Sequence, residues 1–403
     1  MKIAGIVAEY NPFHNGHADH IARTRDPRGG AGATHVVAVM SGNFVQRGEP
    51  ALFPKAERVR AALLGGVDLV LELPVPWALS SAERFALGGV SLLNALGCVD
   101  VLSFGSECGD LDALKAAAEA MSAPSYIQQV KYRMEMGGSA AEAQQQALAE
   151  LGGTRMARLL GTPNNVLGLE YLKALRRLGS PIDPFTVPRT GAAHDADMPI
   201  GGTASASFLR RLARENRWNN AAPYLPPEEF ELLTAALGAG RAPTDPAQME
   251  RALLLRLRAA TPTQIAGIAG VSEGLENRLL TAAASADSLQ ALLAAVKTKR
   301  YPLTRLQRLV WSAAISIPAA MAAEEPPYLR VLGLNERGAE ILSAARHSAA
   351  RPLLSRATQA DALDGFVREV WRVECRAGEW FALMTPTPLP RGGEYTDGVV
   401  RME

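Results

Sequence analysis

The sequence predicts an α/β fold in which a parallel sheet is followed by a mainly helical carboxyl-terminal part. Short apolar runs rich in β-branched residues alternate with helix-like segments over the first part of the chain, which is the pattern of a parallel sheet. Beyond Pro223, Pro226 and Pro227 such runs are scarce. At 403 residues the chain also exceeds the usual size of one domain. We therefore predict two domains, residues 1–222 and residues 223–403.

The expected elements follow from apolar runs and the residues that end them. Residues 2–8 form an apolar strand, and Asn11-Pro12 ends it because proline lacks an N–H and restricts the residue before it. A helix is expected from Gly16 to Arg25, and residues 35–40 form a second unbroken strand. Proline or glycine marks the ends of the later elements, which are helices at 54–64 and 82–96, strands at 68–73, 99–104 and 181–189, and a helix after Pro163.

The composition excludes several classes of protein. The net charge is +1, so no global field indicates a polyanion partner and any nucleic-acid surface must be local. Cys98, Cys108 and Cys375 are scattered without C-x-x-C spacing, which argues against a zinc site or a disulfide framework. No apolar run approaches the roughly 18 residues of a membrane span. The sequence thus predicts a cytoplasmic protein with no membrane segment, no protein-bound metal and no obligate protein partner.

Two histidines mark the predicted functional edge of the sheet. His14 and His17 lie between the first strand and the next helix, where helix amides and the helix dipole favour a phosphate. Gly16 lets a phosphate approach the backbone, and two imidazoles three residues apart face the same side of a helix. The alternative is a pair of packed histidines beside a turn, which is common for a single histidine and uncommon for His-x-Gly-His after an amino-terminal strand.

These residues resemble a known family. His14-Asn15-Gly16-His17 looks like the signature of the nucleotidyltransferase superfamily, whose members bind ATP on a Rossmann-like sheet. The longer run GIVAEYNPFHNGH, residues 5–17, is similar to the bacterial tRNA(Met) cytidine acetate ligases, as are SGNFVQRGEPA and TKRY. The resemblance implies that ATP activates acetate as acetyl-adenylate, and that the acetyl group passes to N4 of the wobble cytidine of elongator tRNA(Met). One departure is Pro54, where the family commonly has an acidic residue.

The resemblance also implies an ATP site, with Mg²⁺ arriving on the nucleotide. His14 and His17 are expected to stabilise the α-phosphate as catalytic residues. Helix capping remains an alternative for the Asn and Ser members of the site. A solvated helix end remains an alternative for Lys55 and its neighbour Arg58. The residues expected to bind ATP are Val7, Ala8, Glu9, Tyr10, Asn11, Pro12, Phe13, His14, Asn15, Gly16, His17, His20, Lys55, Gly105, Asn164, Asn165, Arg189, Ser205, Ser207 and Arg210.

The strongest signal for RNA binding lies in the carboxyl-terminal part. Residues 297–308 carry five basic side chains and no acidic one. Arginine forks suit phosphate and an interleaved tyrosine suits base stacking, although a charged run is often only a solvated face. The predicted tRNA-binding residues are Lys297, Lys299, Arg300, Tyr301, Arg305 and Arg308.

Two other functions remain open on the sequence. An adenylyltransferase that acts on a small phosphate ester or mononucleotide would share the histidine motif but would not need the basic carboxyl-terminal half. A non-catalytic RNA-binding protein would keep the basic stretch and would not need His14. Acetate-dependent chemistry on tRNA distinguishes the predicted ligase from both.

Overall fold

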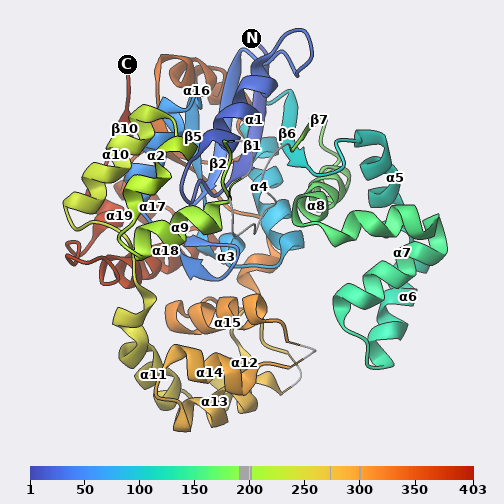
Figure 1. Ribbon diagram of the computed structural model, residues 1–403, viewed down its shortest axis with the longest axis vertical. Coiled ribbons are helices and arrows are strands. Elements are labelled where there is room, and N and C mark those ends of the chain that lie inside the picture. Colours follow the sequence, from blue (N-terminus) through green and yellow to red (C-terminus); the bar gives the residue numbers. More distant parts are fainter. Residues whose placement is uncertain (190–198, 200–201, 273, 299–300) are drawn as a thin grey trace.

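The computed structural model describes residues 1–189, 199, 202–272, 274–298 and 301–403, and it has a mixed sheet at its centre (Figure 1). The strand order is β10-β8-β5-β2-β1-β6-β7, with β9 paired to β8. The strands are β1 (Ile3–Ala8), β2 (His35–Ser41), β5 (Leu69–Leu73), β6 (Val101–Ser106), β7 (Asp183–Pro188), β8 (Leu329–Leu334), β9 (Leu353–Leu354) and β10 (Val400–Arg401). A separate hairpin consists of β3 (Phe44–Val45) and β4 (Glu49–Pro50).

The five strands that the first half of the chain adds to the central sheet are parallel to one another, as predicted. Successive side chains of β2 enter different cores, with Val37 and Val39 on one face and Val36 and Ala38 on the other. Helices α1 (Asn15–Arg25) and α2 (Lys55–Leu64) cover one face, while α4 (Ala82–Leu96) and α16 (Glu336–Ser348) cover the other. Burial on both faces explains why these strands are unbroken apolar runs.

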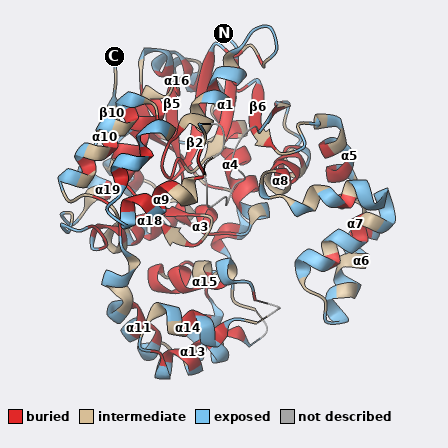
Figure 2. Cartoon of the chain, in the orientation of Figure 1, coloured by how far each residue is buried: buried red, intermediate tan, exposed pale blue. Residues whose placement is uncertain are grey.

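The remaining helices surround this core or extend from it. Helices α11 to α15 lie together below the sheet, and α6 and α7 project from its side (Figure 1). Figure 2 shows the burial concentrated in the sheet and the helices against it. The helices besides α1, α2, α4 and α16 are α3 (Val75–Ala78), α5 (Leu111–Met121), α6 (Pro124–Glu135), α7 (Ala140–Ala157), α8 (Pro163–Arg177), α9 (Ala206–Arg214), α10 (Pro227–Gly238), α11 (Glu250–Ala259), α12 (Pro262–Ala266), α13 (Leu275–Ser285), α14 (Leu289–Val296), α15 (Leu303–Ile315), α17 (Ala357–Asp361), α18 (Phe366–Ala382) and α19 (Gly393–Thr396).

The second half of the chain returns to the sheet. Strand β8 pairs antiparallel with β5, and β10 pairs with β8 near the carboxyl terminus. The predicted α/β class and the helical carboxyl-terminal region are confirmed. The boundary at residue 222 stays a prediction, and the sheet itself crosses it. Within the described part of the chain, no helix is long and apolar enough to cross a membrane.

Candidate active site

The candidate site lies where the strand order of the sheet reverses. From β1 the chain adds β2 and then β5 on one side, and β6 and then β7 on the other. Open α/β sheets bind ligands outside the carboxyl ends of their strands at such a reversal. Strand β1 leads into the histidine motif, and β6 and β7 end near Gly105 and Arg189. The topology therefore brings residues from distant parts of the sequence to one edge.

His14 and His17 form a stacked pair at the start of α1. The ring centroids are 3.8 Å apart with an interplanar angle of 24°. Nδ1 of His14 accepts the N–H of Gly16 at 3.1 Å, and Nδ1 of His17 accepts the N–H of His14 at 3.3 Å. Because Nδ1 is an acceptor in both rings, each neutral ring carries its proton on Nε2. The backbone thus holds both imidazoles as Nε2 hydrogen-bond donors.

Close packing fixes the position of this pair. The His17 ring lies 5.0 Å from the ring of Tyr10 and 5.5 Å from that of Phe13, and both aromatic residues are buried. A Cβ atom at Gly16 would lie 2.9 Å from Cε1 of His14. Glycine at this position therefore makes room for the His14 ring, in addition to any approach by a phosphate.

Arg210 ties the histidine loop to helix α9. Its Nη1 donates to the backbone carbonyl of Asn11 at 2.9 Å, across a sequence separation of 199 residues. Its Nη2 lies 3.1 Å from Oγ of Ser207 and 3.2 Å from a carboxylate oxygen of Glu49. Ser205 is the N-cap of α9 and accepts the N–H of Phe208 at 3.0 Å. Capping is therefore observed at Ser205, and contacts of these three residues with phosphate stay predictions.

The rest of the loop after β1 serves partly as framework. Val7 and Ala8 end the strand, and Asn11 Oδ1 accepts the N–H of Leu52 at 2.7 Å. Glu9 accepts the N–H of Gln46 at 2.8 Å, and burial raises the pKa of its carboxyl group. Asn15 donates to the carbonyl of Pro223 at 3.1 Å. Pro12 follows Asn11 through a cis peptide bond.

Gly105, Asn164 and Arg189 meet on the other side of the reversal. The backbone N–H of Arg189 donates to the carbonyl of Ser106 at 2.9 Å, and a Cβ atom at Gly105 would lie 3.2 Å from Cγ of Arg189. Nη1 of Arg189 donates to Oδ1 of Asn164 at 3.3 Å. Asn165 is buried and its Oδ1 accepts the N–H groups of Glu107 and Cys108. The stem of Arg189 therefore crosses the glycine, and its guanidinium group is held by Asn164.

His20 lies on α1 beside β6 and is neutral at physiological pH. Its Nε2 is 2.9 Å from Oγ of Ser103, which is 2.7 Å from Oγ1 of Thr24. Burial, with a smaller contribution from the charge of Arg189, lowers the pKa of His20 to about 4. His20 thus forms part of the wall between helix and strand, and its predicted contact with ATP is not tested by this arrangement.

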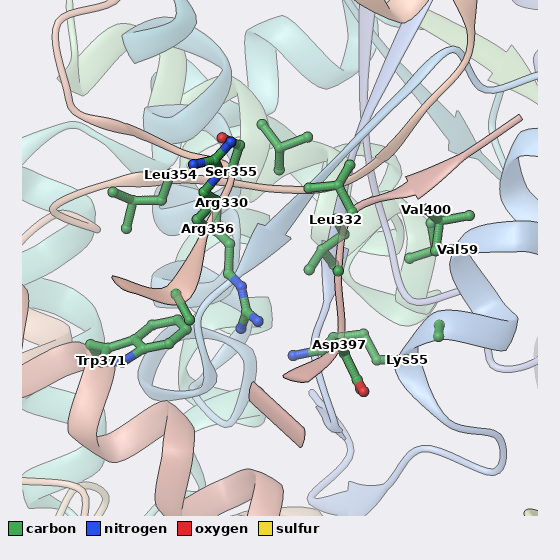
Figure 3. A pocket seen from close by; sticks show the side chains of 15 residues that line it. Lys55, Val59, Arg330, Leu332, Leu354, Ser355, Arg356, Trp371, Asp397 and Val400 are labelled. Carbon is green, nitrogen blue, oxygen red and sulfur yellow. The ribbon is translucent and has the colours of Figure 1, made fainter. Parts of the chain in front are cut away.

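Lys55 differs from the expectation for a phosphate ligand. Its Nζ lies 2.6 Å from carboxylate oxygens of both Glu72 and Glu394. Arg330 binds the same two carboxylates. Lys55, Arg330 and Trp371 line a small cavity, as Figure 3 shows. The volume of this cavity is about 40 Å³. Helix α2 packs against β5 and β8, so Lys55 at its start lies on that side of the sheet. We therefore leave Lys55 out of the proposed nucleotide site.

Two residues with clear roles were not in the predicted site. Arg58 is fully buried and donates to the backbone carbonyls of Glu9, Ser41 and Phe53, so it braces the ends of β1 and β2 rather than reaching a phosphate. Glu107 links β6 to α8. The sequence signal for Glu107 is its place two residues after Gly105, directly after the end of a strand, but its partners are not visible in the sequence.

The predicted tRNA-binding residues fall into different environments. Lys297 is exposed at the end of α14, whereas Tyr301 is 8% exposed with the Arg305 guanidinium carbon 5.1 Å from its ring centre. Arg305 donates to Oγ of Ser272 at 2.6 Å. Tyr301 therefore differs from the expected stacking platform, because the protein itself covers its ring.

Arg308 and the remaining two predicted residues complete this comparison. Nη1 of Arg308 donates to the backbone carbonyl of Gln46 at 3.0 Å, which joins α15 to the loop between β3 and β4. Lys299 and Arg300 lie outside the described residues. Among the residues that the structure does describe, no group of three His, Cys, Asp or Glu side chains could hold a metal ion. Whether Mg²⁺ accompanies the nucleotide is not tested by that observation.

Comparisons with known proteins agree over nearly the whole chain. The family model described as HIGH nucleotidyl transferase matches residues 1–395. A tRNA(Met) cytidine acetate ligase of Alkaliphilus metalliredigens is 36% identical over 402 residues, covering 95% of this chain and 94% of that protein. The ligase of Acetivibrio thermocellus is 34% identical over 418 residues and covers 100% of both chains.

Solved structures give the same result. The crystal structure of Thermotoga maritima TmcAL without ligand has a TM-score of 0.94 and 32% sequence identity, and the match covers 100% of both chains. The structure of that protein bound with alpha-thio ATP has a TM-score of 0.92 and 32% identity, covering 100% of this chain and 99% of the other. The sequence and fold similarity therefore extend through the helical region and the returning strands.

Proposed function

Because this chain belongs to the tRNA(Met) cytidine acetate ligase family of HIGH nucleotidyl transferases, we propose that it acetylates the wobble cytidine of elongator tRNA(Met). The reaction uses ATP and acetate and forms N4-acetylcytidine. The observation that carries the proposal is the stacked pair His14 and His17 at the reversal of the strand order. Since tRNA is the proposed substrate, we place the enzyme in the cytoplasm.

In the first half-reaction an acetate oxygen attacks the α-phosphorus of ATP, and the bond to pyrophosphate breaks. Negative charge grows on the α-phosphate and on the leaving pyrophosphate, so the step needs positioned donors more than a base. We propose that the Nε2–H groups of His14 and His17 donate to the α-phosphate. Each preorganised donor of this kind typically contributes about 10²–10³ in rate.

We propose that further contacts with ATP come from the motif loop, His20, Gly105, Asn164, Asn165 and Arg189, and that Ser205, Ser207 and Arg210 at the start of α9 contact the phosphates. Gly105 leaves room for the stem of Arg189, whose guanidinium group would bind a phosphate. Mg²⁺ would be held by the phosphate oxygens, because hard cations prefer such ligands in nucleotide sites.

In the second half-reaction the N4 amine of cytidine attacks the acetyl carbonyl carbon, AMP leaves with the electrons of the anhydride bond, and the nitrogen releases one proton to solvent. The target base must leave its stack to reach the adenylate, which is cheap for a single-stranded anticodon base. We propose that Lys297 contacts the tRNA together with Lys299 and Arg300. Arg305 and Arg308 act mainly through their own intramolecular bonds, which shape this surface.

The proposed reaction is tested with purified protein, ATP, acetate and unmodified elongator tRNA(Met). We expect acetate-dependent exchange of pyrophosphate into ATP, and N4-acetylcytidine by mass spectrometry of the tRNA. The variant His17→Ala should lower both by at least about 100-fold. Pyrophosphate release that needs a small phosphate ester instead of acetate would favour the adenylyltransferase alternative, which no comparison supports.

The proposed tRNA contact is tested by the salt dependence of binding. Lys297→Ala should weaken tRNA binding. It should also make the negative slope of log affinity against log salt concentration shallower by about 1, because one phosphate contact is lost. Arg346→Ala is the matched control, since Arg346 is an exposed cation on α16, which packs on the sheet away from Lys297. An equal effect of both variants would remove Lys297 from the proposed interface.

A further inference from the structure

Glu107 joins the end of β6 to the start of α8. Its Oε1 accepts the backbone N–H of Asn164 at 3.1 Å and the side-chain Nδ2 of Asn164 at 2.6 Å, and its Oε2 accepts the backbone N–H of Asn165 at 2.8 Å. Asn165 Oδ1 in turn accepts the N–H groups of Glu107 and Cys108 at 3.0 and 3.2 Å. Both carboxylate oxygens are therefore engaged by one helix start.

This arrangement supplies the cap that α8 lacks. Thr162 is the N-cap residue and makes no capping bond through its side chain, and Pro163 at the first helical position has no N–H. The next two N–H groups, those of Asn164 and Asn165, point to Glu107. The start of α8 therefore already binds an anion that belongs to the protein, so a nucleotide phosphate in this region must rely on other donors.

Glu107 also determines which way the Asn164 amide points. A carboxylate only accepts hydrogen bonds, so the Nδ2 group of Asn164 must face it. The Oδ1 atom then faces away from Glu107 and accepts Nη1 of Arg189 at 3.3 Å. A flipped amide would set oxygen against the carboxylate and NH₂ against the guanidinium group. Burial raises the pKa of Glu107, but the hydrogen bonds from Asn164 and Asn165 outweigh it, and the net pKa is lowered.

Arg189 is a long side chain that needs such an anchor. Its stem lies across Gly105, and its own backbone N–H is bonded to Ser106. A free arginine loses much rotamer freedom when it binds a ligand, and a partner that restrains it beforehand reduces that loss. The hydrogen bond that Nη1 of Arg189 donates to Oδ1 of Asn164 provides this restraint.

We propose that Glu107 is a positioning residue of the nucleotide site, which acts through Asn164 to hold Arg189 in the orientation that meets the triphosphate. The proposal rests on the proposed function only in taking Arg189 as a contact to ATP. Glu107 itself touches no substrate. The part of its effect on ATP binding that passes through Arg189 must therefore vanish when Arg189 is absent, and only an effect through the proposed ATP contacts of Asn164 and Asn165 can remain.

A double-mutant cycle tests this dependence. The affinity for a non-hydrolysable ATP analogue is measured by calorimetry for the wild type, Glu107→Gln, Arg189→Ala and the double variant. Glutamine keeps the size of the side chain but presents an NH₂ group to one helix N–H. We expect Glu107→Gln to weaken binding about tenfold, the effect of one charge-assisted hydrogen bond. In the Arg189→Ala background the same change should weaken binding less than about twofold.

A nearby carboxylate provides the matched control. Asp110 lies in the same loop and caps α5 through the N–H of Ala113 at 2.9 Å. Asp110→Ala removes a helix cap without touching the nucleotide site, so it should lower the melting temperature and leave the affinity for the ATP analogue within about twofold of wild type. This control separates loss of a cap from loss of positioning.

The outcomes are distinguishable. Equal effects of Glu107→Gln with and without Arg189, or an unchanged affinity of the single variant, overturn the proposal. If Glu107→Gln does not fold, the cycle is run with Glu107→Asp, whose shorter carboxylate should weaken binding in the same non-additive way, and an unchanged affinity there also overturns it. Non-additive ATP binding without any N4-acetylcytidine would preserve this inference while refuting the proposed ligase reaction.

Discussion

Replacing Gly16 with alanine separates the stability of α1 from the geometry of the histidine pair. The added Cβ would lie 2.9 Å from Cε1 and 3.1 Å from Nδ1 of His14, so the ring must move by several tenths of an ångström. That movement disturbs the 3.8 Å stack with His17 and the Nδ1 bond that orients the ring. Alanine meanwhile favours a helix over glycine by up to about 1 kcal/mol. The change therefore acts on activity and stability in opposite directions.

Acetate-dependent exchange of pyrophosphate into ATP measures the activity. We expect Gly16→Ala to lower the exchange rate by about 100-fold or more, which is the effect of losing one preorganised donor. The melting temperature should stay within about 3 °C of wild type. Gly238→Ala is the control, because a Cβ there meets no atom within 4 Å at the end of α10. An exchange rate for Gly16→Ala within about threefold of wild type would refute the assignment of His14 to the α-phosphate.

Three further predictions concern buried charge. Because burial lowers the pKa of His20 from 6.5 to about 4, His20 binds a proton in the unfolded chain at pH values at which it is still neutral in the folded protein. Stability should fall by up to about 2 kcal/mol between about pH 7 and about pH 5, and His20→Gln should remove that part of the fall in urea unfolding. Burial, with the nearby charge of Glu72, raises the pKa of Glu374 well above 4.5, so the stability that this group contributes is lost as the pH rises above about 4.5; Glu374→Gln should flatten the decline of the melting temperature over that rise in pH. Lys55→Met removes one of the two cations that pair with the buried carboxylates of Glu72 and Glu394, which must then share the charge of Arg330, and a loss below about 1 kcal/mol in the free energy of unfolding would contradict the expected loss of about 3–5 kcal/mol.

The strands of the first half of the chain could be predicted from the sequence because the residue patterns that indicate them are local. The expected strand at residues 35–40 is β2 (His35–Ser41), and the expected helix at 82–96 is α4 (Ala82–Leu96). Helices cover both faces of these strands, so the apolar runs are continuous, and proline or glycine ends them. The returning strands carry a weaker signal. A short run at 328–334 does not reveal that it pairs antiparallel with β5, because pairing depends on contacts between distant segments.

Contacts with residues far away in the sequence also explain why two expected site residues have other neighbours than the predicted ligands. Lys55 looks like a phosphate ligand at a helix start, yet its partner Glu394 lies 339 residues later. Tyr301 looks like a stacking residue in a basic run, yet the protein buries it and Arg305 covers it. In both cases the residue type was informative about charge or shape, and its neighbours in space decided its use.

The amino-acid sequence by itself determined the alternation of strands and helices, the turn after the first strand and the histidine motif, because each is encoded within a few neighbouring residues. Only the tertiary structure decided that Arg189, Asn164 and Glu107 form one unit beside that motif, and that Arg210 supports it from α9. The physical reason is that hydrogen bonds and ion pairs between side chains depend on distance in space. The path of the chain across the sheet sets that distance, and no local pattern records it.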